Sequence, residues 1–291
     1  MAPQLSVVVA GSRPQGPPDA LFRALGALLE NGTVELLLAT ARPDAQTQWP
    51  GTRVVQCASG SNVPAMRLAG IRAAKAPLIA MTEDFCIPSD GWAESLLRAR
   101  ARVDAAVLGG PIARRDGTAA DWALTFAEYG RFFRQTPEGE VGDLPSINVA
   151  YDADWLRSVL PTDAVGLVET QIHAQLRIQG ARFWRVPDAV MLDENTRPLT
   201  VAARAQYHHG RLLGGGRVED MRLIQRTVRG ALACLVPLVL LHRILREAGT
   251  AGVNAELLRS LPALLFLLIA WSIGEGMGSL FGKEQSAAHW T

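Results

Sequence analysis

The chain has 291 residues, with 29 basic and 28 acidic side chains and a formal net charge of +1. This length suits one large α/β domain with an appendage or two compact domains, and the balanced charge disfavours nucleic acid as a partner. The three cysteines, Cys57, Cys86 and Cys234, form no CxxC pair and no zinc-type cluster with histidine, which favours a reducing, cytosolic environment.

The first two thirds of the sequence alternate short apolar runs with amphipathic segments. The run from Leu5 to Ala10 is apolar throughout except for Ser6, as is typical of a strand covered on both faces. This alternation of strands and helices predicts βαβ units and an α/β fold with a mostly parallel sheet. Strands are predicted at 5–10, 34–39, 53–57, 78–81, 107–110, 146–151 and 183–192, and helices at about 17–30, 63–74, 93–102, 122–133 and 169–179.

An acidic pair, Glu83-Asp84, directly follows the predicted strand at 78–81. Ligands of such sheets bind at the carboxyl ends of strands. Carboxylate oxygens bind Mg²⁺ or Mn²⁺ while the phosphates of a nucleotide complete the coordination shell. The pair therefore predicts a site for a divalent cation and a phosphorylated ligand, although solvated charges or a helix cap would also account for two adjacent acids.

The segment from Ser59 to Trp92, SGSNVPAMRLAGIRAAKAPLIAMTEDFCIPSDGW, resembles the centre of inverting family 2 glycosyltransferases of the GT-A fold. In that family an arginine precedes an apolar Gly-Ile helix, and a strand, an acidic Asp-x-Asp-type motif, a proline and a Gly-Trp pair follow. Two later blocks agree, LPSINVAYDADWL and LVETQIHAQLRIQGARFWRVPDAVMLDE. The resemblance implies a Rossmann-like sheet flanked by helices, with residues 1–205 as the GT-A domain.

The resemblance also implies which residues bind the two substrates. The donor, a nucleotide sugar, is expected to bind to Arg13, Arg67, Glu83, Asp84 and Arg211, with Glu83 and Asp84 also holding the cation. The acceptor is expected beside Trp92, Asn148 and His208.

Glu169 and His173 are the residues to which the resemblance assigns catalysis. A carboxylate near the acceptor acts as general base, taking the proton as the hydroxyl attacks the anomeric carbon from the face opposite the nucleotide. Inversion follows. His173 lies one helical turn beyond Glu169 and shares its face, so it is expected to orient the base or the acceptor. The alternative for Glu169 is an acid at a helix start that the dipole stabilises.

Several positions differ from the family pattern. Phe85 occupies the third place of the acidic motif and cannot bind a metal. Thr40 stands where many members have an aspartate, with Asp44 only later, and Thr170 replaces a second acid beside Glu169. Asp193-Glu194, after the last predicted strand, is a candidate replacement ligand or a polar turn. These departures leave open a catalytically degenerate scaffold for glycan assembly. A nucleotidyltransferase is a further alternative, although residues 11–18, GSRPQGPP, make a poor phosphate loop.

Residues 206–291 are predicted to form a helical, membrane-associated region. The segment 257–280 approaches the ~20 apolar residues that span a bilayer, whereas 230–241 is shorter and carries Pro237. The cluster Gly214-Gly215-Gly216 is expected to mark the boundary before these segments. An apolar dimerisation helix in a soluble homo-oligomer is the competing interpretation.

Arg222, Arg226 and Arg229 precede the first apolar segment, and by the positive-inside tendency they keep the preceding domain cytoplasmic. Together these features predict a glycosyltransferase at the cytoplasmic face of the cell membrane. It would pass a sugar with inversion from a nucleotide sugar to a lipid-linked or surface glycan acceptor, because tethering raises its encounter rate with such a substrate.

Overall fold

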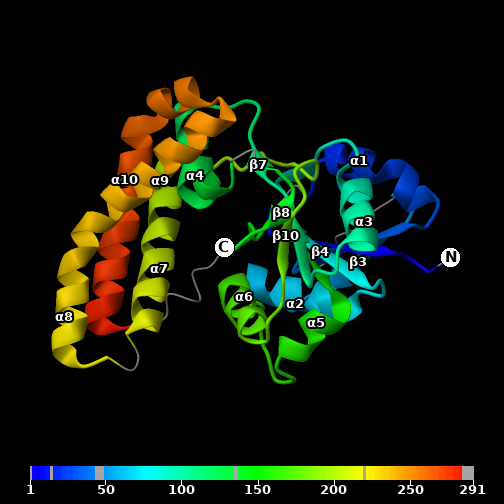
Figure 1. Cartoon of the computed structure of the whole chain (residues 1–291), viewed down its shortest axis with the longest axis horizontal. Helices are drawn as coiled ribbons and strands as arrows, with labels where there is room; N and C mark the ends of the chain where they lie inside the picture. The colour runs from blue at the N-terminus through cyan, green and yellow to red at the C-terminus, as the bar shows by residue number, and fades with distance from the viewer. Residues whose placement is uncertain (1, 14–15, 43–48, 134–136, 219–220, 284–291) are drawn as a thin grey trace. The chain divides into compact units, whose positions relative to one another are not determined.

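The computed structural model describes residues 2–13, 16–42, 49–133, 137–218 and 221–283 (Figure 1). The chain forms two compact units. The first comprises residues 1–113 and 135–194, and the second comprises residues 114–134 and 195–291. A helix from the middle of the chain, α4 (Ala119–Tyr129), therefore belongs to the same unit as the C-terminal helices.

The first unit is built on a mixed sheet that, among the described residues, has eight strands. Strands β1 to β4 are mutually parallel where they pair, whereas β9 runs antiparallel to both of its neighbours. The α/β fold with a mostly parallel sheet is thus confirmed. In spatial order the strands are β3 (Thr52–Gln56), β2 (Val34–Thr40), β1 (Leu5–Gly11), β4 (Leu78–Glu83), β9 (Val149–Asp152), β6 (Val107–Gly109), β10 (Phe183–Arg185) and β8 (Gly139–Glu140).

Helices cover both faces of this sheet. Figure 1 shows α1 (Asp19–Glu30) and α3 (Trp92–Arg102) on one side, and α2 (Val63–Ala73), α5 (Ala153–Val159) and α6 (Glu169–Ile178) on the other. The strand β1 is buried along its whole length, as its apolar sequence predicts. Apolar side chains of the sheet, α2, α5 and α6 form a common core, which fixes these helices relative to the strand ends.

Helix α2 lies unusually close to β1. A Cβ atom on Gly70 would come within 2.3 Å of Val8 Cγ1, so only glycine permits this approach. The helix begins at Asn62, whose side chain accepts a hydrogen bond from the Ala65 backbone, and Pro64 occupies its first turn. These features set the position of Arg67, which α2 carries one turn before Gly70.

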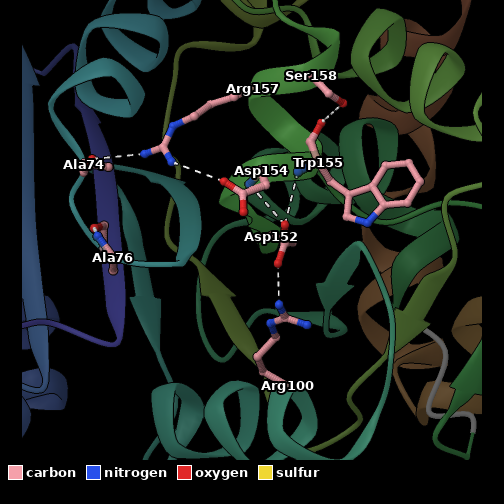
Figure 2. Close-up of polar contacts among 9 residues, drawn as sticks. Ala74, Ala76, Arg100, Asp152, Asp154, Trp155, Arg157 and Ser158 are labelled. Atoms are coloured by element: carbon pink, nitrogen blue, oxygen red, sulfur yellow. Dashed lines mark hydrogen bonds and ion pairs between the residues drawn. The ribbon is translucent and has the colours of Figure 1, made fainter.

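Asp152 starts helix α5 and joins it to α3 (Figure 2). Its Oδ1 accepts hydrogen bonds from the backbone N–H groups of Asp154 and Trp155, and its Oδ2 contacts Arg100 of α3. Arg157, one turn into α5, reaches the Ala74 carbonyl beyond the end of α2. Asp152, the last residue of β9, therefore links α5 to α3, and Arg157 links α5 to the residue that follows α2.

The single strand predicted at 183–192 is instead two strands in different sheets. β10 joins the large sheet, and β11 (Met191–Asp193) joins a small sheet between β5 (Cys86–Pro88) and β7 (Ile112–Ala113). Pro187 has no N–H to donate to a ladder, and the chain turns here, with the Ala189 N–H bonded to the Val186 carbonyl. Because of this turn, residues 183–193 contribute one strand to each sheet.

The second unit is helical. Its long C-terminal helix α10 packs against α4, α7, α8 and α9. Short 3₁₀ segments follow α4 and separate α8 from α9. The helices after α4 are α7 (Leu199–Arg217), α8 (Leu223–Leu232), α9 (Val236–Ala251) and α10 (Asn254–Phe281).

The glycine cluster at 214–216 lies in the last turn of α7, which ends at Arg217, and its role as a domain boundary stays a prediction. A Cβ on Gly210 or Gly214 would come within 2.2 Å of a backbone carbonyl oxygen of α10. In turn, a Cβ on Gly274 or Gly278 of α10 would come within 2.0 and 2.1 Å of carbonyl oxygens of α7. We call these four residues the glycine interlock. Glycine here serves close helix packing rather than chain flexibility.

Two helical stretches are long and apolar enough to cross a membrane. They are Leu223–Ala251, with 11% of its most apolar window buried, and Asn254–Phe281, with 39% of that window buried. Length and composition alone do not separate a membrane span from the core helix of a soluble protein.

Candidate functional site

The connections of the sheet indicate where a ligand of this fold would bind. The chain passes from β1 to β2 on one side of β1, and from β3 to β4 on its other side. Connections that diverge in this way leave a crevice at the carboxyl ends of the two central strands. Glu83 ends β4 and Asp84 follows it, while Arg13 lies just beyond the end of β1. The acidic pair therefore lies at the sheet edge where open α/β sheets bind their ligands.

Asp84 is completely buried and only partly satisfied. Its Oδ2 accepts a hydrogen bond of 2.6 Å from the Arg13 backbone N–H, whereas its Oδ1 is buried with no hydrogen-bond partner. Burial raises the pKa of Asp84 to about 6, against the lowering effect of the Arg13 N–H and of the Arg13 and Arg42 charges. A buried carboxylate oxygen without a partner is unfavourable, so this atom is suited to meet a cation or a hydrogen-bond donor.

Arg67 joins the acidic motif to helix α6. Its guanidinium contacts the carboxylate of Glu83 on β4 and that of Glu169 at the first position of α6. All three side chains are buried. Arg67 thus has two carboxylate partners, and its contact with the donor stays a prediction. Through Arg67 the candidate base is held near the strand end that carries the acidic pair.

His173 lies in a second buried polar group on α6. One ring nitrogen, Nε2, is 2.7 Å from the Tyr151 hydroxyl, and the other, Nδ1, is 2.7 Å from Asp143. Because the Asp143 carboxylate only accepts, the neutral ring carries its proton on Nδ1 and accepts at Nε2 from the Tyr151 hydroxyl. Nδ1–H then donates to Asp143, which also accepts from Arg177. The histidine therefore anchors α6 to β9 and to the loop before it.

Sequence reasoning missed Tyr151 and Asp143 as partners of this histidine. In the sequence Tyr151 looks like any other strand residue, and Asp143 lies in a polar loop. Neither residue is therefore part of a recognisable local motif. Only the folded chain brings them to the two ring nitrogens.

Thr40 has a structural role at the end of β2. Its hydroxyl donates a 2.8 Å hydrogen bond to the Gly11 carbonyl at the end of β1 and accepts from the Arg42 N–H. Arg42, which belongs to none of the sequence motifs described above, is close enough to lower the pKa of Asp84. Asp44 lies outside the described residues. A threonine here therefore joins two strand ends and leaves Arg42 beside the acidic pair.

Trp92 and Asn148 are buried together on the first unit. The Trp92 indole N–H donates to Asn148 Oδ1 at 2.8 Å, and the Asn148 amide donates to the carbonyls of Pro111 and Ala189. These bonds use the indole donor and both amide hydrogens within the protein. The two side chains therefore contribute to packing. Contact of either residue with an acceptor stays a prediction.

His208 and Arg211 lie on α7, in the second unit. The Arg211 Nε donates to the Gly282 carbonyl at 3.3 Å, and the His208 ring packs edge-on against Tyr207. Their assignment to acceptor and donor stays a prediction.

The residues available to a metal are few. Phe85 is buried in the core, and Glu83 is paired with Arg67. Asp193 lies opposite Cys86 in the small sheet. Within the described part of the chain, no three His, Cys, Asp or Glu side chains converge as a metal site. The unpaired Asp84 oxygen fits a cation that takes its remaining ligands from water and substrate phosphates, as Mg²⁺ commonly does.

No protein-family model and no curated protein matches the sequence. Solved structures match it in fold. The mannosyltransferase PcManGT from Pyrobaculum calidifontis, in complex with GDP-Man and Mn²⁺, aligns over 94% of this chain and 87% of its own, with a TM-score of 0.53 and 13% identity. TarS 1-349 from S. aureus aligns over 94% of this chain and 90% of its own, with a TM-score of 0.50 and 11% identity. At these identities the likeness establishes a shared fold.

Proposed function

We propose that the protein is a glycosyltransferase that moves a sugar from a nucleotide-sugar donor to an acceptor hydroxyl with inversion. Residues 1–205 would carry out the transfer, and residues 206–291 would associate with the membrane. The acceptor would be a lipid-linked or surface glycan presented at the cytoplasmic face of the cell membrane.

The contact of Arg67 with both Glu83 and Glu169 carries this proposal. It brings the strand-end acidic motif and the candidate base to one place, at the edge where the connections of the sheet diverge. A donor held at the acidic motif would therefore present its anomeric carbon near α6. The fold shared with PcManGT, solved with GDP-Man and Mn²⁺, supports the same chemistry.

In this reaction the acceptor oxygen forms a bond to the anomeric carbon while its proton passes to the Glu169 carboxylate. The bond between the anomeric carbon and the diphosphate oxygen breaks, and its electron pair stays on the diphosphate. Asp84 would hold a divalent cation, which would supply positive charge to offset that of the leaving diphosphate. Arg67 holds the Glu169 carboxylate in place, and His173 fixes the turn of α6 that follows it.

Calorimetry tests the proposal directly. Purified protein is titrated with a panel of nucleotide sugars, beginning with GDP-mannose, in the presence of Mn²⁺. We expect binding heat that Asp84→Ala abolishes and Asp154→Ala leaves unchanged, since the exposed Asp154 tests the loss of an acid elsewhere on the same unit.

Two outcomes would replace the proposal. Absence of heat with every nucleotide sugar, from protein shown to be folded by circular dichroism, would favour the scaffold in glycan assembly. A preference for free nucleoside triphosphates over nucleotide sugars would favour a nucleotidyltransferase.

A further inference from the structure

Leu223–Ala251 forms one continuous helical stretch with an exposed apolar face. Ile224 and Leu223 are 71% and 74% exposed, which is unusual for branched apolar residues in water. A shallow groove of about 360 Å³ on α8 is lined mainly by apolar side chains, among them Met221, Ile224 and Val228. The exposed large apolar residues of the stretch are Leu223, Ile224, Val228, Leu232, Leu235, Leu238, Val239 and Leu245. We call them the α8–α9 face.

Two arginines of α8, Arg226 and Arg229, contact α10, although Arg229 also contributes to the lining of the groove. Arg226 donates to the carbonyls of Ser279 and Leu280 at the end of α10. Arg229 pairs with the buried carboxylate of Glu275, which also accepts from Arg217 at 2.9 Å. A helix on a water-facing surface turns its charges outward and its apolar residues inward. In α8 two arginines contact α10 while four large apolar side chains are exposed, so an apolar environment is expected on that side.

Exposed basic residues flank the α8–α9 face at both ends. Arg222 precedes it, and His242, Arg243 and Arg246 lie near its far end. An apolar face bordered by cations matches the boundary between acyl chains and anionic headgroups of a lipid bilayer.

Helix α10, the other apolar stretch, is unsuited to cross the bilayer alone. The glycine interlock joins its backbone to that of α7, a helix that carries Arg204 and Arg211. Moving α10 into the hydrocarbon would either break that contact or take charged side chains with it. The helical pair α8–α9 instead exposes the apolar residues named above, and it runs alongside α10 (Figure 1).

We propose that the α8–α9 face docks this protein onto an anionic lipid bilayer, with the helix lying in the interface and α10 supporting it from behind. From the sequence, 257–280 is long enough to span a bilayer, while 230–241 spans poorly, lies in the interface or pairs with the second segment as a hairpin; this proposal assigns the lipid contact to 223–251. The inference rests on the second unit and holds whether or not the first unit transfers sugar.

Vesicle flotation of the full chain tests this docking. Protein is mixed with vesicles of phosphatidylcholine alone or with phosphatidylglycerol, and no nucleotide sugar is present. We expect binding to the anionic vesicles, with Ile224→Glu and Val228→Glu each lowering the partition coefficient by about tenfold or more, since each removes a side chain from lipid and adds a charge. The matched control is Ile178→Glu, an isoleucine of α6 in the first unit that is 79% exposed, and it should bind like the unaltered chain.

Three outcomes would overturn the docking. One is binding of Ile224→Glu and Val228→Glu equal to that of Ile178→Glu. Another is resistance of the protein to alkaline carbonate extraction, which would show that a helix spans the bilayer. The third is a detergent-free dimer in sedimentation velocity that Ile224→Glu converts to monomer while neither form floats, which would assign the face to a second copy. Because no donor is present, failure here leaves the calorimetric test of sugar transfer unaffected.

Discussion

Arg67 on α2 contacts Glu169 at the start of α6, and the same guanidinium contacts Glu83 at the end of β4. One buried cation thus balances two buried carboxylates. Its loss would leave both acids in the interior without a counter-charge, a far larger effect than the loss of a surface ion pair.

Arg67→Met should therefore lower the free energy of unfolding by about 3–5 kcal/mol, measured by urea denaturation at pH 7. Arg53→Met is the control, because Arg53 pairs with Glu35 at the surface, where such pairs contribute about 0–1 kcal/mol. Equal losses in the two variants would contradict a buried bridge.

Asp84→Asn should stabilise the protein at pH 8. Burial raises the pKa of Asp84 to about 6 from 3.8. The folded chain therefore binds more protons than the unfolded chain between about pH 4 and 6, and stability falls as pH rises through that window. The full penalty, about 3 kcal/mol, is present above pH 6 and disappears near pH 4. Thermal unfolding across this range should show the variant gaining at high pH only, and Asp154→Asn should show no such dependence.

Glu169→Gln should lower kcat by about 10²–10⁴-fold while donor binding in calorimetry persists, because the amide cannot accept the acceptor's proton. Asp163→Asn, an exposed acid in the loop before α6, should keep its activity. Full activity of Glu169→Gln would remove the residue from the reaction and leave it as an acid at a helix start.

His173→Phe should destabilise the first unit by about 1–3 kcal/mol, since it leaves the buried Tyr151 hydroxyl without its acceptor. A positioning role also predicts a lower kcat with an unchanged KM for the donor, and partial recovery in His173→Gln. Loss of stability with unaltered kcat would make the histidine purely structural.

Gly274→Ala should disrupt the helical unit, because its Cβ would lie 2.0 Å from the Tyr207 carbonyl oxygen. We expect a loss of about 1–3 kcal/mol or more. Gly249→Ala in α9 is a matched glycine whose nearest neighbour would be 3.9 Å away, and it should gain up to about 1 kcal/mol from helix propensity. A gain in both variants would argue against the interlock.

Much of the first unit could be predicted because its signals are local. The apolar run at β1, the Asn31-Gly32 end of α1 and the acidic pair after β4 each follow from neighbouring residues. Gly32 has a φ of 75°, which explains why glycine ends that helix. The Arg67 contacts could not be foreseen, because they depend on how α2, β4 and α6 meet in space.

The second unit was harder to predict because the same glycines are compatible with two different structures. Gly214 suits a break in the chain as well as a close approach of two helices, and only its contact with Glu275 distinguishes them. The arginines of α8 were expected as cytoplasmic flanking charges, yet Arg226 and Arg229 bind α10. Sequence hydropathy measures how apolar a segment is and not which of its faces is covered.

The glycine interlock also bears on how the chain matures on the ribosome. Helices α4 and α7 are synthesised well before α10, the partner that covers them. Until residue 281 has left the exit tunnel, the faces of α7 and α4 that α10 covers lack their main partner. We therefore expect a chain released before α10 is complete to aggregate rather than to fold as a shorter protein.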